Sequence, residues 1–317
     1  SVDFPWDSPG ALQVLPALRV VGSMMTAMMM RPVRMRRMPA PKPYVFSIET
    51  TRNMKSEAPH IPGTFELPPA TAVPPMTTTA IDIRRYSVPM LSAAPPEKLA
   101  SSGWTGAYVV TEWGPTGHWE SPLTTWKAPI EDDASRKAVL LQQRYEQVIA
   151  ADTRQGLGSY VFLWGNKQER TPTWYGLFLP SGESTPAVDA MQYVWTGAWP
   201  TNRAPSIRPL RLDGRVAIDS IVLAPGASYA AQVEASDPEG DPLRYRWTVL
   251  HESTATSIGG DREDVPPQVA LAVQEDGKGG MTFTAPAAPG DYRLFVEVHD
   301  GHGHAAYANL PFRVAPR

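Results

Sequence analysis

The chain has 317 residues, and its 29 Lys and Arg against 32 Asp and Glu give a net charge of −3 that does not favour nucleic acid or acidic membrane surfaces as partners. The absence of cysteine excludes disulfides, thiolate metal sites and a cysteine nucleophile. No run of about 18 apolar residues occurs, so we expect no membrane span. A hydrophobic content of 42% indicates a folded protein, and the length allows one to three domains.

Residues 1–95 have a composition unlike the rest of the chain. Ten of the twelve methionines precede residue 91, arginines follow the run Met28–Met30, and prolines recur throughout. No helical or strand periodicity is sustained there, so we expect an irregular or disordered region. Three interpretations remain open: a shifted reading frame, a linker, or a basic, Met-rich binding tail. We favour the first, because a repeat of GAT codons encodes Asp in one frame and Met in the next.

Residues 96–200 predict alternating strands and helices. Apolar strands are expected at Ala107–Thr111 and at Gly158–Trp164. Between them, Glu131–Asp152 has the periodicity of an amphipathic helix. A second helix is expected to begin at Thr185, since Thr suits the N-cap and the proline after it suits the first turn. This order is typical of parallel β/α construction.

Residues 206–317, which follow an expected linker at 201–205, predict an all-β sandwich of short strands. Pro-Gly and Asp-Gly pairs mark turns between these strands. Trp247, which has alternating polar neighbours, is the predicted core aromatic. The expected strands are Val216–Leu223, Ser228–Ala235, Leu243–Leu250, Met281–Thr284, Tyr292–His299 and Ala305–Val314.

A carboxylate, Glu112, follows the first predicted strand of the β/α region. The C-terminal ends of parallel barrel strands carry the catalytic groups of such enzymes, so this position suits a catalytic residue. Retaining glycosidases use one carboxylate to attack the anomeric carbon and a second, about 5–5.5 Å away, to protonate the leaving oxygen. From these residues alone, a glutamate that ends an ordinary strand is an equally good interpretation.

The segments YVVTEWGPTGHWESP and GSYVFLWGNKQERTPTWYG, with a predicted helix between them, resemble the C-terminal end of clan A glycoside hydrolases. They are most similar to family 2-like TIM-barrel glycosidases, over residues 104–200. The resemblance implies that the two strands are the seventh and eighth of a (β/α)8 barrel, so the chain holds a partial barrel, its last two β/α units. It also implies that Glu112 is the catalytic nucleophile and that Trp164 floors the sugar subsite.

Further candidate substrate contacts lie beside the two strands. Trp113 and Trp119 suit the C–H faces of sugar rings, which pack on indole, although filling the barrel rim is the alternative. His118 is interpreted either as a partner of a sugar hydroxyl or as an incidental loop histidine. Lys167 and Gln168 are predicted to bind substrate hydroxyls, and a solvated loop is the alternative.

The same resemblance identifies what the chain lacks. Clan A enzymes carry an acid/base glutamate after the fourth strand, usually directly after asparagine, and this sequence contains no Asn-Glu pair. A full barrel takes about 250 residues, so six strands have no counterpart here. General acid catalysis typically contributes a factor of about 10²–10⁴, so we expect the chain as it stands to be inactive.

The C-terminal region resembles the PKD or cadherin-like, immunoglobulin-type modules of bacterial secreted hydrolases. The segments ASDPEGDPLRYRW and YRLFVEVHDGHGHA carry this resemblance. Some such modules bind calcium, which takes carboxylate oxygens as ligands. The candidate ligands are Asp237, Glu239, Asp241 and Asp300. A charged Pro/Gly turn without an ion is the alternative that we favour.

These features together predict a retaining glycoside hydrolase that acts on a polysaccharide or oligosaccharide without an organic cofactor. The kind of C-terminal module leads us to expect a secreted or periplasmic protein. A non-catalytic carbohydrate-binding or adhesive surface protein is the alternative, because aromatic loops can bind sugars without cleaving them. The sequence does not identify the sugar, the linkage, or endo versus exo action.

Overall fold

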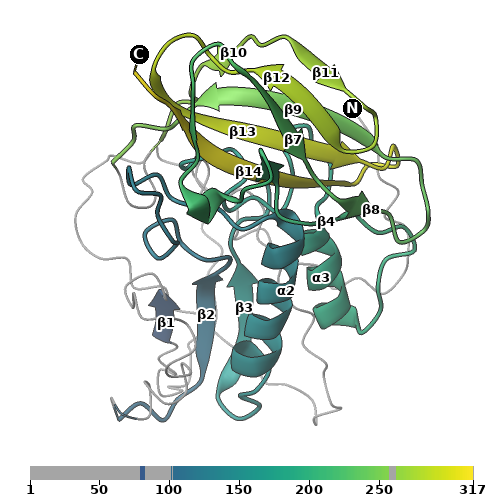
Figure 1. Ribbon diagram of the computed structural model, residues 1–317. Helices are drawn as coiled ribbons and strands as arrows, with labels where there is room; N and C mark the ends of the chain where they lie inside the picture. Colours follow the sequence, from purple (N-terminus) through teal and green to yellow (C-terminus); the bar gives the residue numbers. More distant parts are fainter. Residues whose placement is uncertain (1–78, 83–100, 102, 257–261, 317) are drawn as a thin grey trace, which may run out of the picture.

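The computed structural model describes residues 79–82, 101, 103–256 and 262–316 (Figure 1). Nearly all of region 1–95 lies outside these residues, so the interpretations given for it stay predictions. The described residues form a β/α part with a parallel sheet and two α-helices, followed by a β-sandwich (Figure 1). Within them, no helix combines the length and the apolar character needed to cross a bilayer.

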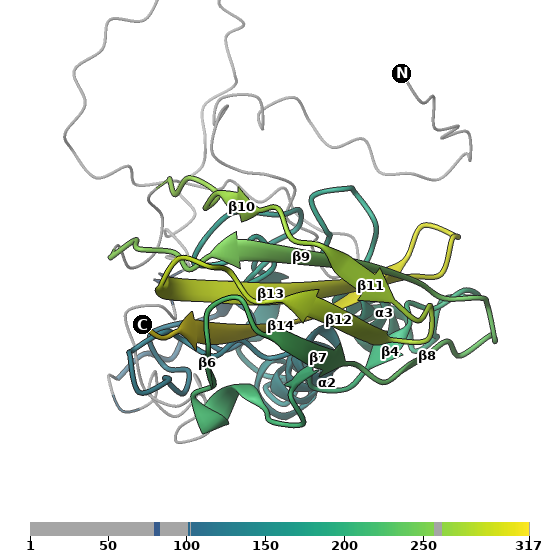
Figure 2. The ribbon, with the colours of Figure 1, turned by 45° about the horizontal axis from the view of Figure 1, so that its top comes forward.

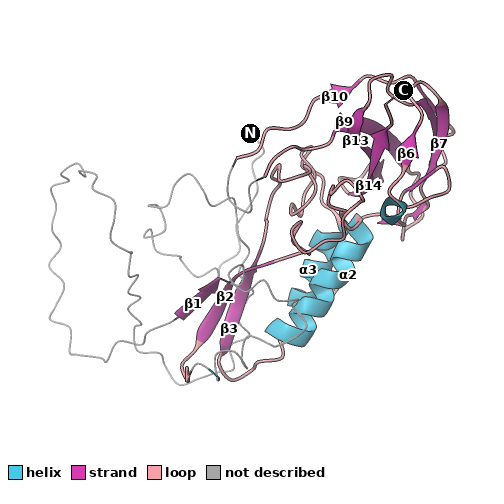
Figure 3. Cartoon of the chain, turned by 60° about the vertical axis from the view of Figure 1, so that its left-hand side comes forward, coloured by secondary structure: helices cyan, strands magenta, loops and turns pink. Residues whose placement is uncertain are grey.

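The β/α part is built on a parallel sheet of three strands. β1 (Thr79–Asp82), β2 (Tyr108–Trp113) and β3 (Gly156–Val161) lie side by side in that order. The helices α2 and α3 lie together on one face of this sheet (Figure 3). A helical crossover is what allows consecutive strands such as β2 and β3 to run parallel. The predicted alternation of strand and helix is therefore confirmed, whereas the expected partial (β/α)8 barrel is not shown by the described residues.

The first helix, α2 (Ala134–Arg144), begins with a side-chain cap at Asp133. The carboxylate of Asp133 accepts a hydrogen bond from the backbone N–H of Arg136 at 2.8 Å, which satisfies a donor that the first helical turn leaves open. The helix continues into a π-helical turn, Tyr145–Ile149. The predicted helix over Glu131–Asp152 is thus confirmed, with a change of winding in its last third.

The second helix, α3 (Pro186–Thr196), also has a local cap at each end. The hydroxyl of Thr185 accepts a hydrogen bond from the backbone N–H of Ala187 at 3.3 Å. At the other end, Gly197 adopts a φ of 79°, a left-handed conformation in which glycine lacks the strain of a Cβ atom. These signals lie within a few residues of the helix ends, so the sequence alone locates them.

A hydrophobic core joins the sheet of the β/α part to its two helices. Leu141 of α2 is 1% exposed, and Met191 of α3 and Val161 of β3 are fully buried. Burial of each such side chain contributes roughly 1.5–3 kcal/mol to stability. The other buried members of this core are Tyr108, Val110, Trp113, Tyr145, Ile149, Leu177 and Ala187.

The sandwich has a five-stranded sheet, in the order β10-β9-β13-β14-β6, and a four-stranded sheet, in the order β11-β12-β7-β5 (Figure 2). Trp247 on β9 is 9% exposed in the core, as predicted. A separate short pair joins β4 to β8. The strands are β4 (Ser206–Ile207), β5 (Arg211–Leu212), β6 (Val222–Leu223), β7 (Ser228–Gln232), β8 (Ala235–Ser236), β9 (Arg244–His251), β10 (Gln268–Val269), β11 (Val273–Glu275), β12 (Gly280–Thr284), β13 (Gly290–His299) and β14 (Ala305–Val314).

One strand prediction is wrong over most of its length. The expected strand Val216–Leu223 is instead a 3₁₀ turn, Ala217–Asp219, followed by the two-residue β6. The carboxylate of Asp219 accepts a hydrogen bond from the Val216 backbone N–H at 2.9 Å, which closes the turn. Ser220 then adopts a left-handed φ of 51°, which an extended strand excludes. Local hydrogen bonding by Asp therefore overrides the apolar pattern.

The β/α part and the sandwich pack closely against one another. Ala134 of α2 and Leu179 of the loop before α3 belong to the same buried cluster as the sandwich core. The expected linker at 201–205 is itself fixed, because the Ala204 backbone N–H donates to the Asp189 carboxylate at 2.7 Å. The two parts thus share buried surface as well as a connecting segment.

Candidate functional site

β2 contains one extra residue immediately beside Glu112. Val110 lies opposite Ser159 of β3 and Trp113 lies opposite Val161, so three steps along β2 match two steps along β3. The pairing of β2 with β1 shifts at the same place. An extra residue of this kind is a β-bulge, and bulges redirect side chains and are frequent next to active sites.

The bulge turns Glu112 away from the helices. Val110 and Trp113 both belong to the core between sheet and helices, so Thr111 and Glu112 between them face the opposite side of the sheet. Glu112 is 8% exposed there, at the C-terminal end of a parallel strand. This is the end at which β/α proteins place their functional groups.

Trp113 is a core residue in the structure. It is 3% exposed, and its ring centroid lies 6.0 Å from that of Tyr145 in the π-helical turn. The Trp113 indole, which was predicted to contact sugar, therefore packs against the π-helical turn instead. Trp119, the other indole predicted in this loop, is only partly buried and lies 4.9 Å, edge to face, from the His118 ring.

Phe162, rather than Trp164, lies on the same face of the sheet as Glu112. Val161 of β3 packs on the helix side, so the next residue, Phe162, faces the other side, where its ring lies 5.6 Å from Tyr175. Trp164 packs instead against Phe178, with ring centroids 4.9 Å apart, and against Trp195 of α3 at 6.4 Å. Trp164 therefore lies on the helix side, and its predicted role as the sugar platform is not supported by its position.

Steric constraints explain why position 114, the last residue of the Thr-Glu-Trp-Gly motif, is a glycine. A Cβ atom on Gly114 would lie 2.6 Å from the backbone carbonyl oxygen of Phe162, closer than real Cβ contacts. The backbone N–H of Phe162 also donates to the carbonyl of Trp113 at 2.6 Å. The ends of β2 and β3 thus approach so closely that only glycine fits at this position.

A group of charged side chains surrounds His118 in the loop after β2. Glu169 is 3% exposed and His118 is 4% exposed, and their Oε1 and Nε2 atoms are 3.5 Å apart. Lys167 Nζ donates to the other carboxylate oxygen of Glu169 at 2.6 Å. Arg170 Nε donates to His118 Nδ1 at 3.4 Å. The His118 backbone N–H donates to the Tyr175 hydroxyl at 3.2 Å, which connects this group to the aromatic side chains beside Glu112.

Glu169 is electrostatically unsuited to donate a proton. Burial acts to raise the pKa of its carboxyl group, but hydrogen bonds from His118 and Lys167 outweigh burial and hold the pKa below its ordinary value. A general acid in a glycosidase needs the opposite shift. Lys167, predicted to bind substrate, is committed to this ion pair. Gln168, predicted alongside it, has both amide atoms buried without a hydrogen-bond partner among the described residues.

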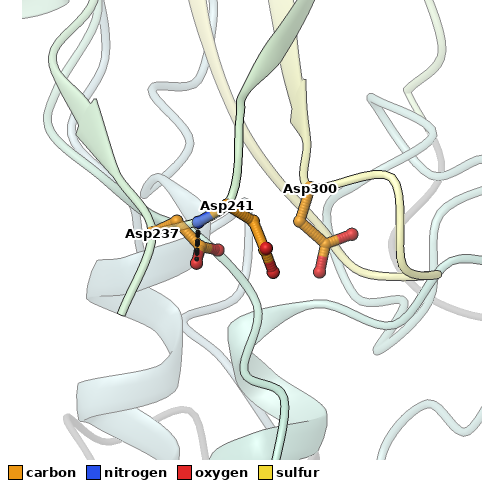
Figure 4. A group of neighbouring side chains, drawn as sticks. All are labelled: Asp237, Asp241 and Asp300. Atoms are coloured by element: carbon orange, nitrogen blue, oxygen red, sulfur yellow. Dashed lines mark hydrogen bonds between the residues drawn. The ribbon is translucent and has the colours of Figure 1, made fainter. Parts of the chain in front are cut away.

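Three aspartates meet at one end of the sandwich (Figure 4). Asp237 and Asp241 come from the loop after β8, and Asp300 follows β13. One carboxylate oxygen from each lies within 4.8 Å of the others. Glu239, the remaining candidate ligand, turns away and accepts a hydrogen bond from the Arg203 backbone N–H at 3.0 Å.

Protein donors already occupy much of this aspartate group. Asp300 accepts hydrogen bonds from the backbone N–H groups of His302 and His304 at 2.7 and 3.1 Å and from the Asn202 side chain at 2.7 Å. Burial acts to raise the pKa of Asp300, but these hydrogen bonds outweigh it and lower the pKa. The oxygen ligands would suit calcium, and calcium binding stays a prediction.

No family model and no curated protein matches the chain. Solved structures resemble it only weakly. A nucleoside hydrolase-related hypothetical protein from Saccharophagus degradans, associated with carbohydrate metabolism, is 17% identical over 41% of this chain and 29% of its own, with a TM-score of 0.27. The PKD domain of an M14-like peptidase from a Thermoplasmatales archaeon is 14% identical over 36% of this chain and 94% of its own, with a TM-score of 0.20. CopC from Methylosinus trichosporium is 19% identical over 31% of this chain and 85% of its own, with a TM-score of 0.21. Similarities at this level carry no argument about function.

Proposed function

We propose that this chain is part of a retaining glycoside hydrolase in which Glu112 is the nucleophile. The observation that supports the proposal most directly is the bulge in β2. It directs a carboxylate to the face away from the helices, at the C-terminal end of a parallel strand. Phe162 and Tyr175 lie on that side, and aromatic rings suit the C–H faces of sugars.

In this proposal, the Glu112 carboxylate attacks the anomeric carbon while the glycosidic bond breaks, which gives a covalent glycosyl-enzyme. Water then hydrolyses that ester and releases the sugar with retained configuration. The first step needs an acid about 5–5.5 Å from the nucleophile, and Glu169, with its lowered pKa, does not suit that role. We therefore expect the acid to come from outside the described residues.

A mechanism-based label tests the nucleophile without requiring the acid. 2,4-Dinitrophenyl 2-deoxy-2-fluoro-β-glycosides of glucose, mannose and xylose carry a leaving group that departs without protonation. Incubation of the chain with each compound should add one fluoroglycosyl group in the intact mass spectrum. Peptide mapping should then place that group on Glu112.

Two variants make the labelling specific. Glu112→Gln should abolish the label, whereas Glu120→Gln, a change at an exposed carboxylate in the same loop, should keep it. A label on another carboxylate, or none from any of the three compounds on chain whose circular dichroism shows it to be folded, would contradict the proposal. Sugar binding without labelling would favour the alternative, a non-catalytic carbohydrate-binding protein.

A further inference from the structure

A cavity of about 440 Å³ lies between the β/α part and the sandwich. One wall comes from the loop after β2 and includes His118, Trp119 and Trp126. The opposite wall comes from Ser253–Thr256, directly after β9. A volume of this size falls within the range of small-molecule sites, roughly 300–1,000 Å³. Neither part of the chain forms this cavity alone.

The acidic groups that line the cavity are already neutralised by the sandwich. Glu252 accepts hydrogen bonds from the Arg293 guanidinium at 2.7 and 3.0 Å. Asp291 accepts two from the Arg313 guanidinium, at 2.5 and 2.8 Å. A free cation would therefore compete with two bidentate arginine pairs, which are among the stronger ion pairs in proteins. The charges of this wall do not favour a metal ion as the occupant.

The remaining lining includes two indole rings and the Ser and Thr hydroxyls of the sandwich wall, together with apolar side chains and the cations Lys127 and Arg170. The Arg313 guanidinium lies 5.1 Å from the ring centroid of Trp126, which holds that indole from one side. Trp119 is held by the edge of the His118 ring at 4.9 Å. Indole faces pack against sugar C–H groups, and Ser and Thr hydroxyls both donate to and accept from sugar hydroxyls. The indole faces and the hydroxyls together match a sugar ring.

A series of ring contacts leads from the cavity wall to the face of the sheet that carries Glu112. His118 and Trp119 line the cavity, and the Trp119 ring lies 6.5 Å from Tyr175. Tyr175 in turn lies 5.6 Å from Phe162, on the face of the sheet that carries Glu112.

We infer that this cavity is a subsite for a sugar unit of the glycan, and that the sandwich supplies one of its walls. The inference rests on the proposed function for the identity of the glycan, but binding in the cavity can be measured independently of cleavage. It assigns to the sandwich a direct part in substrate binding. It also gives Trp126 a role in binding.

Calorimetric titration of the Glu112→Gln chain with cellotetraose, xylotetraose and mannotetraose tests the inference. At least one of the three should bind, and Trp119→Ala and Trp126→Ala should each weaken its binding by about tenfold or more. Thr254→Trp, at an exposed position on the sandwich wall, should fill the cavity and weaken binding without removing any core contact. Trp199→Ala, at an indole that is 39% exposed and outside the cavity, serves as the matched control and should leave binding unchanged.

Two outcomes would overturn the inference: no binding of any of the three sugars, or binding that survives both Trp126→Ala and Thr254→Trp. The result is separable from the labelling of Glu112. Labelling without cavity binding would leave the nucleophile assigned and remove the subsite. Cavity binding without labelling would leave a sugar-binding site on a protein that is not a glycosidase.

Discussion

The Asn309 side chain, on β14 of the sandwich, donates a hydrogen bond at 2.6 Å to the carboxylate of Glu131, which precedes α2 in the β/α part. Glu131 is 5% exposed and also accepts hydrogen bonds from the hydroxyls of Thr171 and Thr173, at 2.5 and 2.9 Å. Its fourth partner is the ammonium group of Lys137 on α2. The carboxylate therefore links the helix, a loop and the sandwich in one buried network.

Lys137 is the cation that pairs directly with Glu131 in this network. Its Nζ donates to the backbone carbonyls of Thr173 and Trp174 at 2.8 and 2.9 Å and to the Tyr307 hydroxyl at 3.1 Å. Burial acts to lower the pKa of Lys137, but Glu131 and Tyr307 outweigh burial and raise it, so the ammonium stays charged. Burial raises the pKa of Tyr307 to about 12, so its hydroxyl stays neutral.

Lys137→Met should lower the free energy of unfolding by about 3–5 kcal/mol, because it leaves the buried Glu131 carboxylate without its counter-charge. Urea denaturation, followed by circular dichroism and by tryptophan fluorescence, measures this. Arg136→Met, at the exposed neighbouring position of α2, is the matched control and should change the unfolding free energy by less than about 0.5 kcal/mol. Equal effects of the two substitutions would show that the network does not stabilise the junction.

A second contact between the two parts should respond to pH. The His299 ring on β13 lies between Glu183 of the loop before α3, at 2.9 Å, and Glu297 of its own strand, at 3.4 Å. The hydrogen bond to Glu297 raises the pKa of His299 most, burial opposes it, and Glu183 adds to the rise. The positively charged guanidinium of Arg246 also lies beside His299, where it pairs with Glu297.

Because the folded pKa of His299 exceeds the ordinary value of 6.5, its contribution to stability is fully present below that pH and is lost as pH rises through the folded pKa. Thermal unfolding at about pH 6 and about pH 9 should therefore show a fall in Tm that His299→Gln reduces. His302→Gln, at a side chain that is 59% exposed, should keep the fall of the unsubstituted chain. A fall of the same size in all three proteins would contradict the prediction.

Asp300→Asn should destabilise the sandwich at neutral pH by about 1–3 kcal/mol, since the substituted amide cannot accept all the hydrogen bonds that the carboxylate receives. The pKa of Asp300 is lowered, so its contribution is present above the ordinary value of 3.8 and is lost as pH falls through the folded value. Denaturation at neutral pH measures the loss, with the exposed Asp264→Asn as control. A calcium titration of the same samples decides between the two interpretations of this turn: a bound ion would raise Tm reversibly with EDTA and less in Asp300→Asn, whereas the favoured turn without an ion predicts no change.

Local signals in the sequence located much of the fold. Asp133 and Thr185 cap the predicted helices because capping depends only on residues within the first turn. The network around Glu131 could not be predicted, since its partner Asn309 lies 178 positions away. Nothing in the local pattern distinguishes a glutamate that is buried at a junction from one on a solvated helix.

The candidate site was predicted only in part, because the positions of its side chains depend on where β3 ends. A continuous strand over Gly158–Trp164 would place Phe162 and Trp164 on one face, because side chains alternate with a period of two. β3 ends at Val161, and the chain then turns, which moves Trp164 to the helix side and leaves Phe162 facing away from the helices. The end of a strand is the least certain feature of a sequence-based prediction.

Gly114→Ala tests whether the close approach of β2 and β3 positions Glu112. The added methyl group would meet the Phe162 carbonyl oxygen at 2.6 Å, and backbone at that distance must move. We expect a loss of about 1–3 kcal/mol in unfolding free energy and, on the proposed function, a loss of labelling at Glu112 in chain that is still folded. Labelling at the unsubstituted rate in Gly114→Ala would mean that the separation of the two strand ends does not control the carboxylate.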